Sequence, residues 1–231
     1  MGNAGIMQGL GRAHSKSGNG KRRGGYSAFR HRCRWRRSLA SAAVKIYTRS
    51  GDDGTTGLFY GGRVAKDSAA PTAYGTVDEA QAMLGVARAH TEPGGKLDQI
   101  LIRLCRDLYV AMAELATLAE NQHKLTPGTT KVTEAMVLAL EETIDAVSER
   151  FSPPTEFVIP GQNLCSAQLD VARTVVRRAE RLSLSVAGVS SLVMVYLNRL
   201  SDLCWTLARW VEAEEGSLPS RSVGGDGPAA G

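Results

Sequence analysis

The chain has 231 residues, 43% of them hydrophobic, which is enough for one domain with a sizeable buried core. The net charge is +5, but residues 1–44 contain ten basic residues and no acidic one, so residues 45–231 hold 18 basic and 23 acidic side chains, a net charge of −5. The basic balance therefore belongs to the N-terminal segment, which weakens any whole-protein argument for nucleic-acid binding. The longest apolar runs, such as residues 192–197, are far shorter than the roughly 18 residues that a membrane span needs.

Residues 1–44 are rich in Gly, Ser and Arg and lack sustained apolar periodicity, so we expect a disordered basic extension. Three interpretations are open: a transit peptide, a basic interaction tail, or a wrongly chosen translation start upstream of a chain that begins near Val44. A transit peptide would direct the protein to the mitochondrial matrix; otherwise we expect it in the cytoplasm. Residues 45–215 then form the domain, and residues 216–231, with almost no apolar side chains, are expected to be a disordered tail.

The domain is expected to open with a short extended segment at 45–48, followed by a loop of small and polar residues at 49–57 that continues irregularly to residue 66. Glycines allow backbone N–H groups to converge on an anion, and the loop hydroxyls can donate to phosphate oxygens. The loop has no Walker A sequence. Asp52 and Asp53 would repel phosphate unless a divalent cation lies between them or they cap local N–H groups. A solvated turn is the alternative interpretation.

From about residue 71 the apolar spacing becomes helical, with breaks at proline and glycine clusters. Helices are expected at 71–90, 96–119, 131–150, 163–187 and 190–214. Helices of about 20–25 residues span about 30–37 Å at 1.5 Å per residue. Their apolar faces and short connections predict an all-α, up-and-down five-helix bundle.

The predicted fourth helix carries three arginines at i, i+4, i+8 spacing, which places them on one face: Arg173, Arg177 and Arg181. Arginine near a packed surface needs a carboxylate or phosphate partner. Arg178 and Glu180 flank this face. The alternative is a surface stripe paired at i, i+3 spacing with Asp170 and Glu180.

Two other helices carry polar groups that could serve a site. Asn198 and Asp202 lie one turn apart on the predicted fifth helix, with Arg209 two turns further along, which indicates either a buried network or the edge of a ligand site. On the first helix, Asp78 could pair with an arginine of another helix. Its alternative is an exposed acid favoured by the helix dipole.

Several patterns do not support a metal or nucleophile site. Glu120 and His123 match half of a di-iron motif that needs a second copy and two further glutamates. The four histidines are too scattered for zinc, and the four cysteines contain no C-x-x-C pair, so we expect reduced, mostly buried thiols. No arrangement of nucleophile, base and orienting group is readable either.

Five segments together resemble the PduO-type ATP:cob(I)alamin adenosyltransferases over about residues 45–215. They are KIYTRSGDDGTTGL (45–58), AYGTVDE (73–79), FVIPG (157–161), ARTVVRRAERL (172–182) and YLNRLSDL (196–203). The resemblance implies a ferritin-like five-helix bundle with an irregular N-terminal ATP-binding loop, assembled as a homotrimer with active sites between subunits. The chain departs from the family pattern at Arg49, where lysine is common, at Gln162, at Asp170, where histidine is frequent, and in the tail after Gly216.

The resemblance also implies roles for individual residues. The residues implied to bind ATP are Thr48, Arg49, Ser50, Gly51, Thr56, Gly57, Lys66, Arg177, Arg178, Glu180, Arg181 and Asn198. Asp78 and Arg173 occupy the positions of the family's salt bridge near the corrin site. Phe157 occupies that of the aromatic residue closing off the lower face of the cobalt. Arg177 joins these three in the implied catalytic set.

The implied reaction transfers the 5′-deoxyadenosyl group of ATP to the cobalt of cob(I)alamin and yields adenosylcobalamin and triphosphate. Mg²⁺ is expected through the ATP phosphates, with no protein ligand assigned. A cobalamin-dependent mutase and a flavin or other reductase are possible partners; no nucleic acid or membrane is expected. The main alternative is a carrier that delivers adenosylcobalamin to a mutase without catalysis. A basic-tailed nucleic-acid-binding bundle and a ferritin-like metal protein are two further alternatives.

Overall fold

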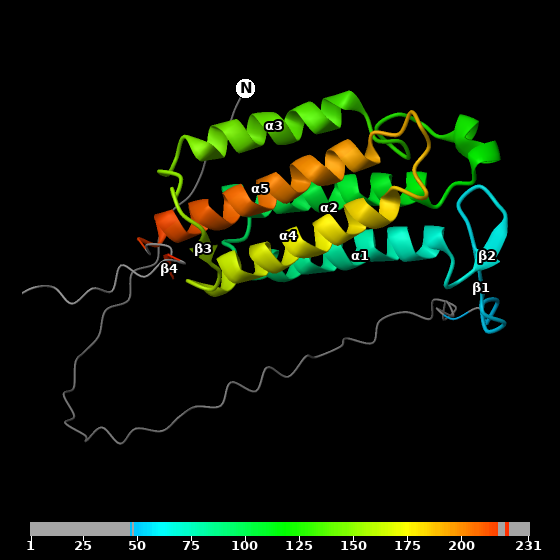
Figure 1. The fold of residues 1–231 in the computed structure, drawn as a ribbon, viewed down its shortest axis with the longest axis horizontal. Coiled ribbons are helices and arrows are strands. Elements are labelled where there is room, and N and C mark those ends of the chain that lie inside the picture. The colour runs from blue at the N-terminus through cyan, green and yellow to red at the C-terminus, as the bar shows by residue number, and fades with distance from the viewer. Residues whose placement is uncertain (1–46, 48, 217–219, 222–231) are drawn as a thin grey trace, which may run out of the picture. The chain divides into compact units, whose positions relative to one another are not determined.

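Five α-helices make up most of the computed structural model, which describes residue 47, residues 49–216 and residues 220–221. Residues 1–46 and Thr48 lie outside the described part, and so do the interpretations that rest on them. The helices are α1 (Ala69–Arg88), α2 (Lys96–Leu115), α3 (Glu134–Ser148), α4 (Leu164–Ser183) and α5 (Val193–Glu214), with a 3₁₀ helix, η1 (Ala119–Lys124), between α2 and α3. Figure 1 shows them as an up-and-down bundle, which confirms the expected fold class.

The helix ends differ from the expected ones where capping groups act. The third helix begins at Glu134 rather than near 131, because Thr133 is its N-cap and accepts the N–H of Met136. Asn163 and Ser166 cap α4 reciprocally, with Ser166 N–H donating to Asn163 Oδ1 at 2.7 Å. The second helix was expected to reach 119 but ends at Leu115, and η1 follows it.

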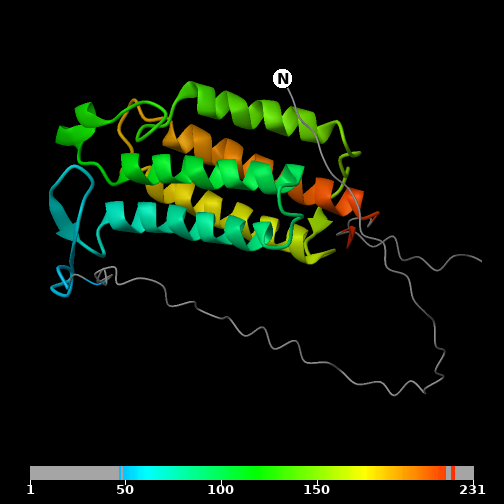
Figure 2. The same cartoon turned by 180° about the vertical axis from the view of Figure 1, so that it is seen from behind.

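Helix α4 packs against both α1 and α5, while α2 packs on α1 and α3 packs on α5. Figures 1 and 2 show this arrangement from opposite sides. Fully buried leucines come from all five helices, among them Leu84, Leu101, Leu140, Leu169 and Leu200. Each such side chain contributes about 1.5–3 kcal/mol through its removal from water, so one shared core holds the helices together. No helix in the described part is long and apolar enough to cross a membrane.

Two short antiparallel ribbons lie at opposite ends of the bundle (Figure 1). At the end where α1 begins, β1 (Thr55–Gly57) pairs with β2 (Arg63–Ala65), so the segment up to residue 66 is more regular than expected. At the other end, β3 (Val158–Ile159) pairs with β4 (Ser220–Arg221). These two residues lie within the segment 216–231, for which a disordered tail was expected. A low content of apolar side chains does not exclude such pairing, because strand pairing uses backbone N–H and C=O groups.

Three described cysteines are free thiols and lie within or beside the core: Cys105, Cys165 and Cys204. Burial raises the pKa of Cys165 to about 11 and that of Cys204 to about 12. The expected reduced, mostly buried thiols are thus confirmed for these residues, whereas Cys33 lies outside the described part. Such thiols stay protonated near neutral pH and do not act as nucleophiles.

We expect Cys165 to react with iodoacetamide at pH 8 about 100-fold more slowly in the folded protein than in the unfolded chain. A pKa of about 11 in place of the ordinary 9.0 leaves about 100-fold less thiolate at that pH. Mass spectrometry of the alkylated peptides over time measures the rates, with the same protein in guanidinium chloride as the control. Alkylation of folded Cys165 at the unfolded rate would contradict the burial described above.

Candidate functional site

The guanidinium group of Arg63 holds the loop at 49–66 in shape. Its Nη2 donates to the carbonyl oxygen of Ser50, and its Nε donates to Thr55 Oγ1 at 3.0 Å. Thr55 donates its N–H and its hydroxyl to Asp53 Oδ1 at 3.0 and 2.8 Å. These hydrogen bonds, the backbone one first, lower the pKa of Asp53. Asp53 therefore caps local groups, one of the two roles left open by the sequence. The sequence analysis did not identify Arg63 as a residue that shapes the loop. The only sign of this role in the sequence is that Arg63 is a basic residue eight positions after Thr55.

Lys66 lies against Gly51, which is where the loop closes on itself. A Cβ atom at Gly51 would lie 3.2 Å from Lys66 Nζ and 3.0 Å from the carbonyl oxygen of Thr55. The structure thus brings together two of the residues predicted to bind ATP. Thr56 and Gly57 follow in β1. Arg49 has a left-handed φ of 60°, and its guanidinium lies 5.5 Å from the centre of the Tyr47 ring.

The arginines of α4 divide into paired and unpaired groups. Arg178 forms an ion pair with Glu79 of α1. Arg177 and Arg181 are exposed, and their guanidinium groups form no ion pair or hydrogen bond with any other described residue. Since α1 and α4 run antiparallel, the pair between Glu79 and Arg178 places both free guanidinium groups on the half of α4 nearer the β1–β2 end (Figure 1).

The predicted residues of α5 connect to α4 in two places. Asn198 Nδ2 donates to Glu180 Oε1 at 3.2 Å, so both predicted ATP ligands are engaged with each other within the chain. Further along α5, Arg209 is 3% exposed and pairs with Asp170 at 2.7 Å and with Glu212 at 3.0 Å. The buried network considered for this helix is therefore found around Arg209. Asp202, in contrast, is exposed.

Within one chain, Asp78 and Arg173 do not pair with each other. Arg173 Nε lies 3.1 Å from Asp170 Oδ1, the i, i+3 pairing given above as the alternative. Asp78 lies exposed on α1 and makes no ion pair in the part of the chain that is described. The predicted salt bridge between Asp78 and Arg173 is therefore not formed within the described chain.

Phe157 lies beside β3, at the opposite end of the bundle from the β1–β2 loop (Figure 1). Its ring is 86% exposed, and the nearby Ile159 and Leu164 are 50% and 55% exposed. A single chain therefore does not bring Phe157 together with the residues predicted to bind ATP. The exposed apolar group at this end instead offers a surface that a ligand or another subunit can cover.

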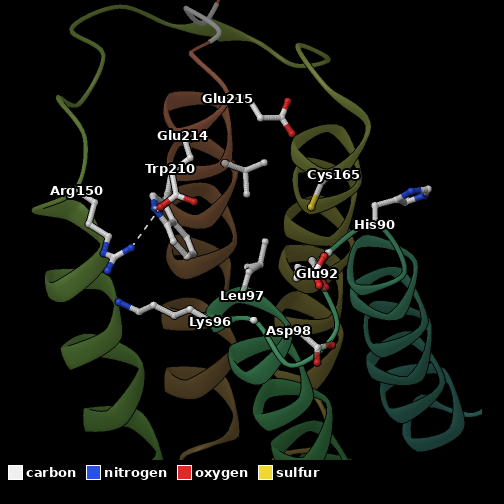
Figure 3. A pocket seen from close by; sticks show the side chains of 13 residues that line it. His90, Glu92, Lys96, Leu97, Asp98, Arg150, Cys165, Trp210, Glu214 and Glu215 are labelled. Carbon is white, nitrogen blue, oxygen red and sulfur yellow. Dashed lines mark hydrogen bonds and ion pairs between the residues drawn. The ribbon is translucent and has the colours of Figure 1, made fainter. Parts of the chain in front are cut away.

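A cavity of about 290 Å³ opens at the end of the bundle where α1 ends and α2 begins (Figure 3). Trp210 lines it and donates from Nε1 to Glu214 Oε1 at 2.7 Å, while Arg150 pairs with the same carboxylate at 3.3 Å. Lys96 Nζ lies 5.8 Å from the centre of the Trp210 ring. None of the residues predicted for the site lines this cavity, so it is distinct from the loop and from the α4 arginines.

The helical bundle, its N-terminal loop and its α4 arginines define a class that comparison with known proteins identifies. Residues 46–211 match the family described as cobalamin adenosyltransferase. A corrinoid adenosyltransferase of Citrobacter freundii is 45% identical over 168 residues, covering 71% of this chain and 93% of that protein. One of Mycobacterium bovis is 42% identical over 176 residues, covering 74% and 90%.

A solved structure agrees with these sequence matches. A variant of the PduO-type ATP:corrinoid adenosyltransferase from Lactobacillus reuteri, complexed with cobalamin and ATP, is 28% identical. It superposes with a TM-score of 0.69 over 77% of this chain and 96% of that one. The chain belongs to the cobalamin adenosyltransferase family.

Proposed function

We propose that this chain is an ATP:corrinoid adenosyltransferase, which transfers the 5′-deoxyadenosyl group of ATP to the cobalt of cob(I)alamin. The relatives named above are corrinoid adenosyltransferases, and the Lactobacillus reuteri structure contains both cobalamin and ATP. The observation that carries the proposal is that three cations, two of them one turn apart on α4, have side chains with no ion pair or hydrogen bond to any described residue: Lys66, Arg177 and Arg181.

These cations suit a polyphosphate. Lys66 lies close to the backbone of the loop at Gly51, and the two arginines belong to the long helix α4. Groups held in place before the reaction stabilise a developing negative charge without reorganising, which makes such electrostatic terms large. Arg178 adds a further cation, although Glu79 already neutralises it in the isolated chain.

The proposed site combines two subunits. The pair between Glu79 and Arg178 marks one level along the bundle. From that level toward the β1–β2 end, α1 extends ten residues to Ala69, about 15 Å at 1.5 Å per residue, whereas Arg181 lies only one turn of α4 beyond Arg178. The loop of one chain therefore lies well beyond the arginines of its own α4. We propose that the loop of one subunit and α4 of its neighbour bind one ATP, within a homotrimer, and that Asp78 meets Arg173 across the same interface.

In the proposed reaction the lone pair of Co(I) attacks C5′ of ATP. A Co–C bond forms, the bond from C5′ to the triphosphate oxygen breaks, and triphosphate leaves with the electron pair. Since cobalt is the nucleophile, the protein needs none, in keeping with the protonated thiols of the core. Holding C5′ in line with the cobalt can contribute up to about 7–11 kcal/mol.

The described residues do not form a resident metal site. They contain no group of three or more His, Cys, Asp or Glu side chains that could hold a metal ion, and Asp53 is engaged by Thr55. We propose that Mg²⁺ enters bound to the phosphates of ATP. The loop and the α4 arginines would then contact the remaining phosphate oxygens.

Phe157 is proposed to cover the lower face of the corrinoid. A large apolar ring that is 86% exposed in the isolated chain is suited to bury itself against a ligand. A dry, apolar wall at that face would exclude water and the axial base. Loss of the axial donor lowers the energy of the cobalt orbital that accepts an electron, so reduction to Co(I) becomes easier.

The proposal extends to partners and location. A flavin-dependent or other reductase would supply the electron, and a cobalamin-dependent mutase would use the product. Neither a nucleic acid nor a membrane takes part in the proposed reaction. We propose a cytoplasmic protein, which the free thiols of Cys105, Cys165 and Cys204 support because reduced cysteines are typical of that compartment.

The test of the function follows the visible spectrum of chemically reduced cob(I)alamin with MgATP and the protein, as the full chain and as residues 45–231. We expect both forms to produce the spectrum of adenosylcobalamin. Binding of cobalamin without conversion would instead indicate the carrier. Loss of conversion in the shorter form alone would show that the N-terminal segment takes part in the reaction.

Gly51→Ala should raise the KM for ATP by about tenfold, because the added Cβ meets the carbonyl oxygen of Thr55 at 3.0 Å and displaces Lys66. Steady-state kinetics measures the effect. Gly188→Ala is the control, since a Cβ there has nothing within 4 Å, and it should leave KM unchanged. Equal KM values for Gly51→Ala and the wild type would remove Lys66 from the site.

Arg177→Ala should raise the KM for ATP or abolish turnover.

Phe157→Ala should lower kcat by at least about tenfold while the KM for ATP stays within about twofold. Neither Phe157 nor Arg177 is buried, so the melting temperature of either variant should change little. Tyr109→Ala removes another exposed ring, 64% accessible on α2, and should behave as the wild type. An unchanged kcat in Phe157→Ala would refute the role of this ring.

A further inference from the structure

Four charged side chains form a continuous series between α5 and α4, from the interior of the bundle to its surface. Arg209 Nε lies 3.0 Å from Glu212 Oε2, Arg209 Nη2 lies 2.7 Å from Asp170 Oδ2, and Arg173 Nε lies 3.1 Å from Asp170 Oδ1. The exposed fractions of the side chains rise along this series, from 1% for Glu212 through 3% and 5% to 28% for Arg173. The inner three groups are thus sealed in the core, and only the last reaches solvent.

The inner groups depend on one another. A charge in the core is costly unless it is paired, and removing one partner of a buried pair leaves the other uncompensated. Burial raises the pKa of Glu212, while the charge of Arg209 lowers it. Two carboxylates and two guanidinium groups give the series no net charge, which is the condition under which it can be buried.

Asp170 divides its two oxygens between an inner and an outer arginine. Oδ2 accepts a hydrogen bond from Arg209. Arg209 also donates to Glu212, and its guanidinium carbon lies 5.9 Å from the centre of the Trp205 ring. Oδ1 accepts from Nε of Arg173. Arg209 fixes the Asp170 carboxylate from the interior of the bundle. The hydrogen bond from Arg173 Nε to that carboxylate therefore fixes the plane of the Arg173 guanidinium group. The two terminal nitrogens of Arg173 make no hydrogen bond within the described residues, so they remain available outside the chain.

We propose that Asp170 is a positioning residue, whose buried carboxylate, fixed by Arg209, orients Arg173 toward the corrinoid side of the site. The inference rests on the proposed function, in which Arg173 acts at that side together with Asp78 of a neighbouring subunit. Arg173 is directed by its own subunit before any neighbour or substrate arrives. Orientation set in advance is what a catalytic arrangement requires, since a displacement of about 1 Å can cost about 100-fold in rate.

The test is a double-mutant cycle on turnover of cob(I)alamin with ATP. Asp170→Asn keeps the shape of the side chain but removes its charge. We expect kcat to fall about tenfold and the KM for cob(I)alamin to rise, with the KM for ATP within about twofold. Arg173→Ala should lower kcat further than Asp170→Asn does. The double variant should have the same kcat as Arg173→Ala alone, because a residue that acts through Arg173 has no effect when Arg173 is absent.

Asp98→Asn is the matched control for loss of a buried carboxylate. Asp98 lies in the first turn of α2, is 5% exposed and pairs with Arg88 at 2.6 Å. We expect both Asp98→Asn and Asp170→Asn to lower the melting temperature, but only Asp170→Asn to lower kcat. A purely structural role of Asp170 would give the two variants the same kinetics, which would overturn the proposal.

A second variant covers the case in which Asp170→Asn does not fold. Arg173→Lys, at a partly exposed position, keeps the positive charge but lacks the planar guanidinium that can donate from Nε to Asp170 and still present two further nitrogens outside the chain. We expect it to lose kcat about as strongly as Arg173→Ala. Kinetics close to the wild type would show that a positive charge suffices without an oriented guanidinium plane, and would overturn the proposal.

The cycle separates the two levels of inference. If Arg173→Ala reduces turnover but Asp170→Asn is normal or additive with it, the positioning role fails while the proposed function stands. If Arg173→Ala itself turns over normally, the role of Arg173 fails, and the positioning role falls with it. Absence of turnover in the wild type would reject the proposed function before either variant is considered.

Discussion

Helix α4 packs against both α1 and α5, and the other features of the molecule depend on this double contact. Its buried face supplies Leu169, Ala172, Val176 and Ala179 to the core. The same twenty residues also carry four arginines, so one helix contributes both to the core and to a basic surface. That combination is stable because the helical period separates the two faces. Guanidinium groups that turn inward, or toward a neighbouring helix, meet a carboxylate there. A change that rotates α4 would therefore disturb the core and the site together.

The cations of the loop and of helices α4 and α5 differ in whether a carboxylate of the same chain pairs with them. Arg209 and Arg178 are neutralised by carboxylates of the same chain, one in the core and one at the α1–α4 contact. Lys66, Arg177 and Arg181 have no such partner among the described residues, although acidic side chains are common in this domain. Repulsion between unpaired cations is a cost that a ligand with several negative charges relieves. Arg173 lies between the two groups, with Nε paired and its terminal nitrogens free.

The five helices could be predicted from periodicity alone, because apolar faces at helical spacing leave few other ways to build a core. Their ends could not, since Thr133 and the pair Asn163–Ser166 act through single hydrogen bonds. The strands of two or three residues are too short to show alternation. For the site, the i, i+3 pairing of Arg173 with Asp170 was foreseen as an alternative, because spacing along one helix is readable in sequence. The contact of Asp170 with Arg209 spans 39 positions and depends on how α4 meets α5, which one sequence does not specify.

The proposed site combines residues from the two ends of the bundle, which a single chain keeps apart. A closed ring of identical chains would bring different surfaces of neighbouring subunits together at every interface, so that in the proposed homotrimer each site would receive one loop and one α4. Within each chain, Arg173 pairs with Asp170 and Arg178 pairs with Glu79, so these two guanidinium groups have defined positions in the single subunit. Lys66, Arg177 and Arg181 have no such partner among the described residues. In the proposed trimer, Arg173 would thus already be oriented by its own subunit when the interface forms.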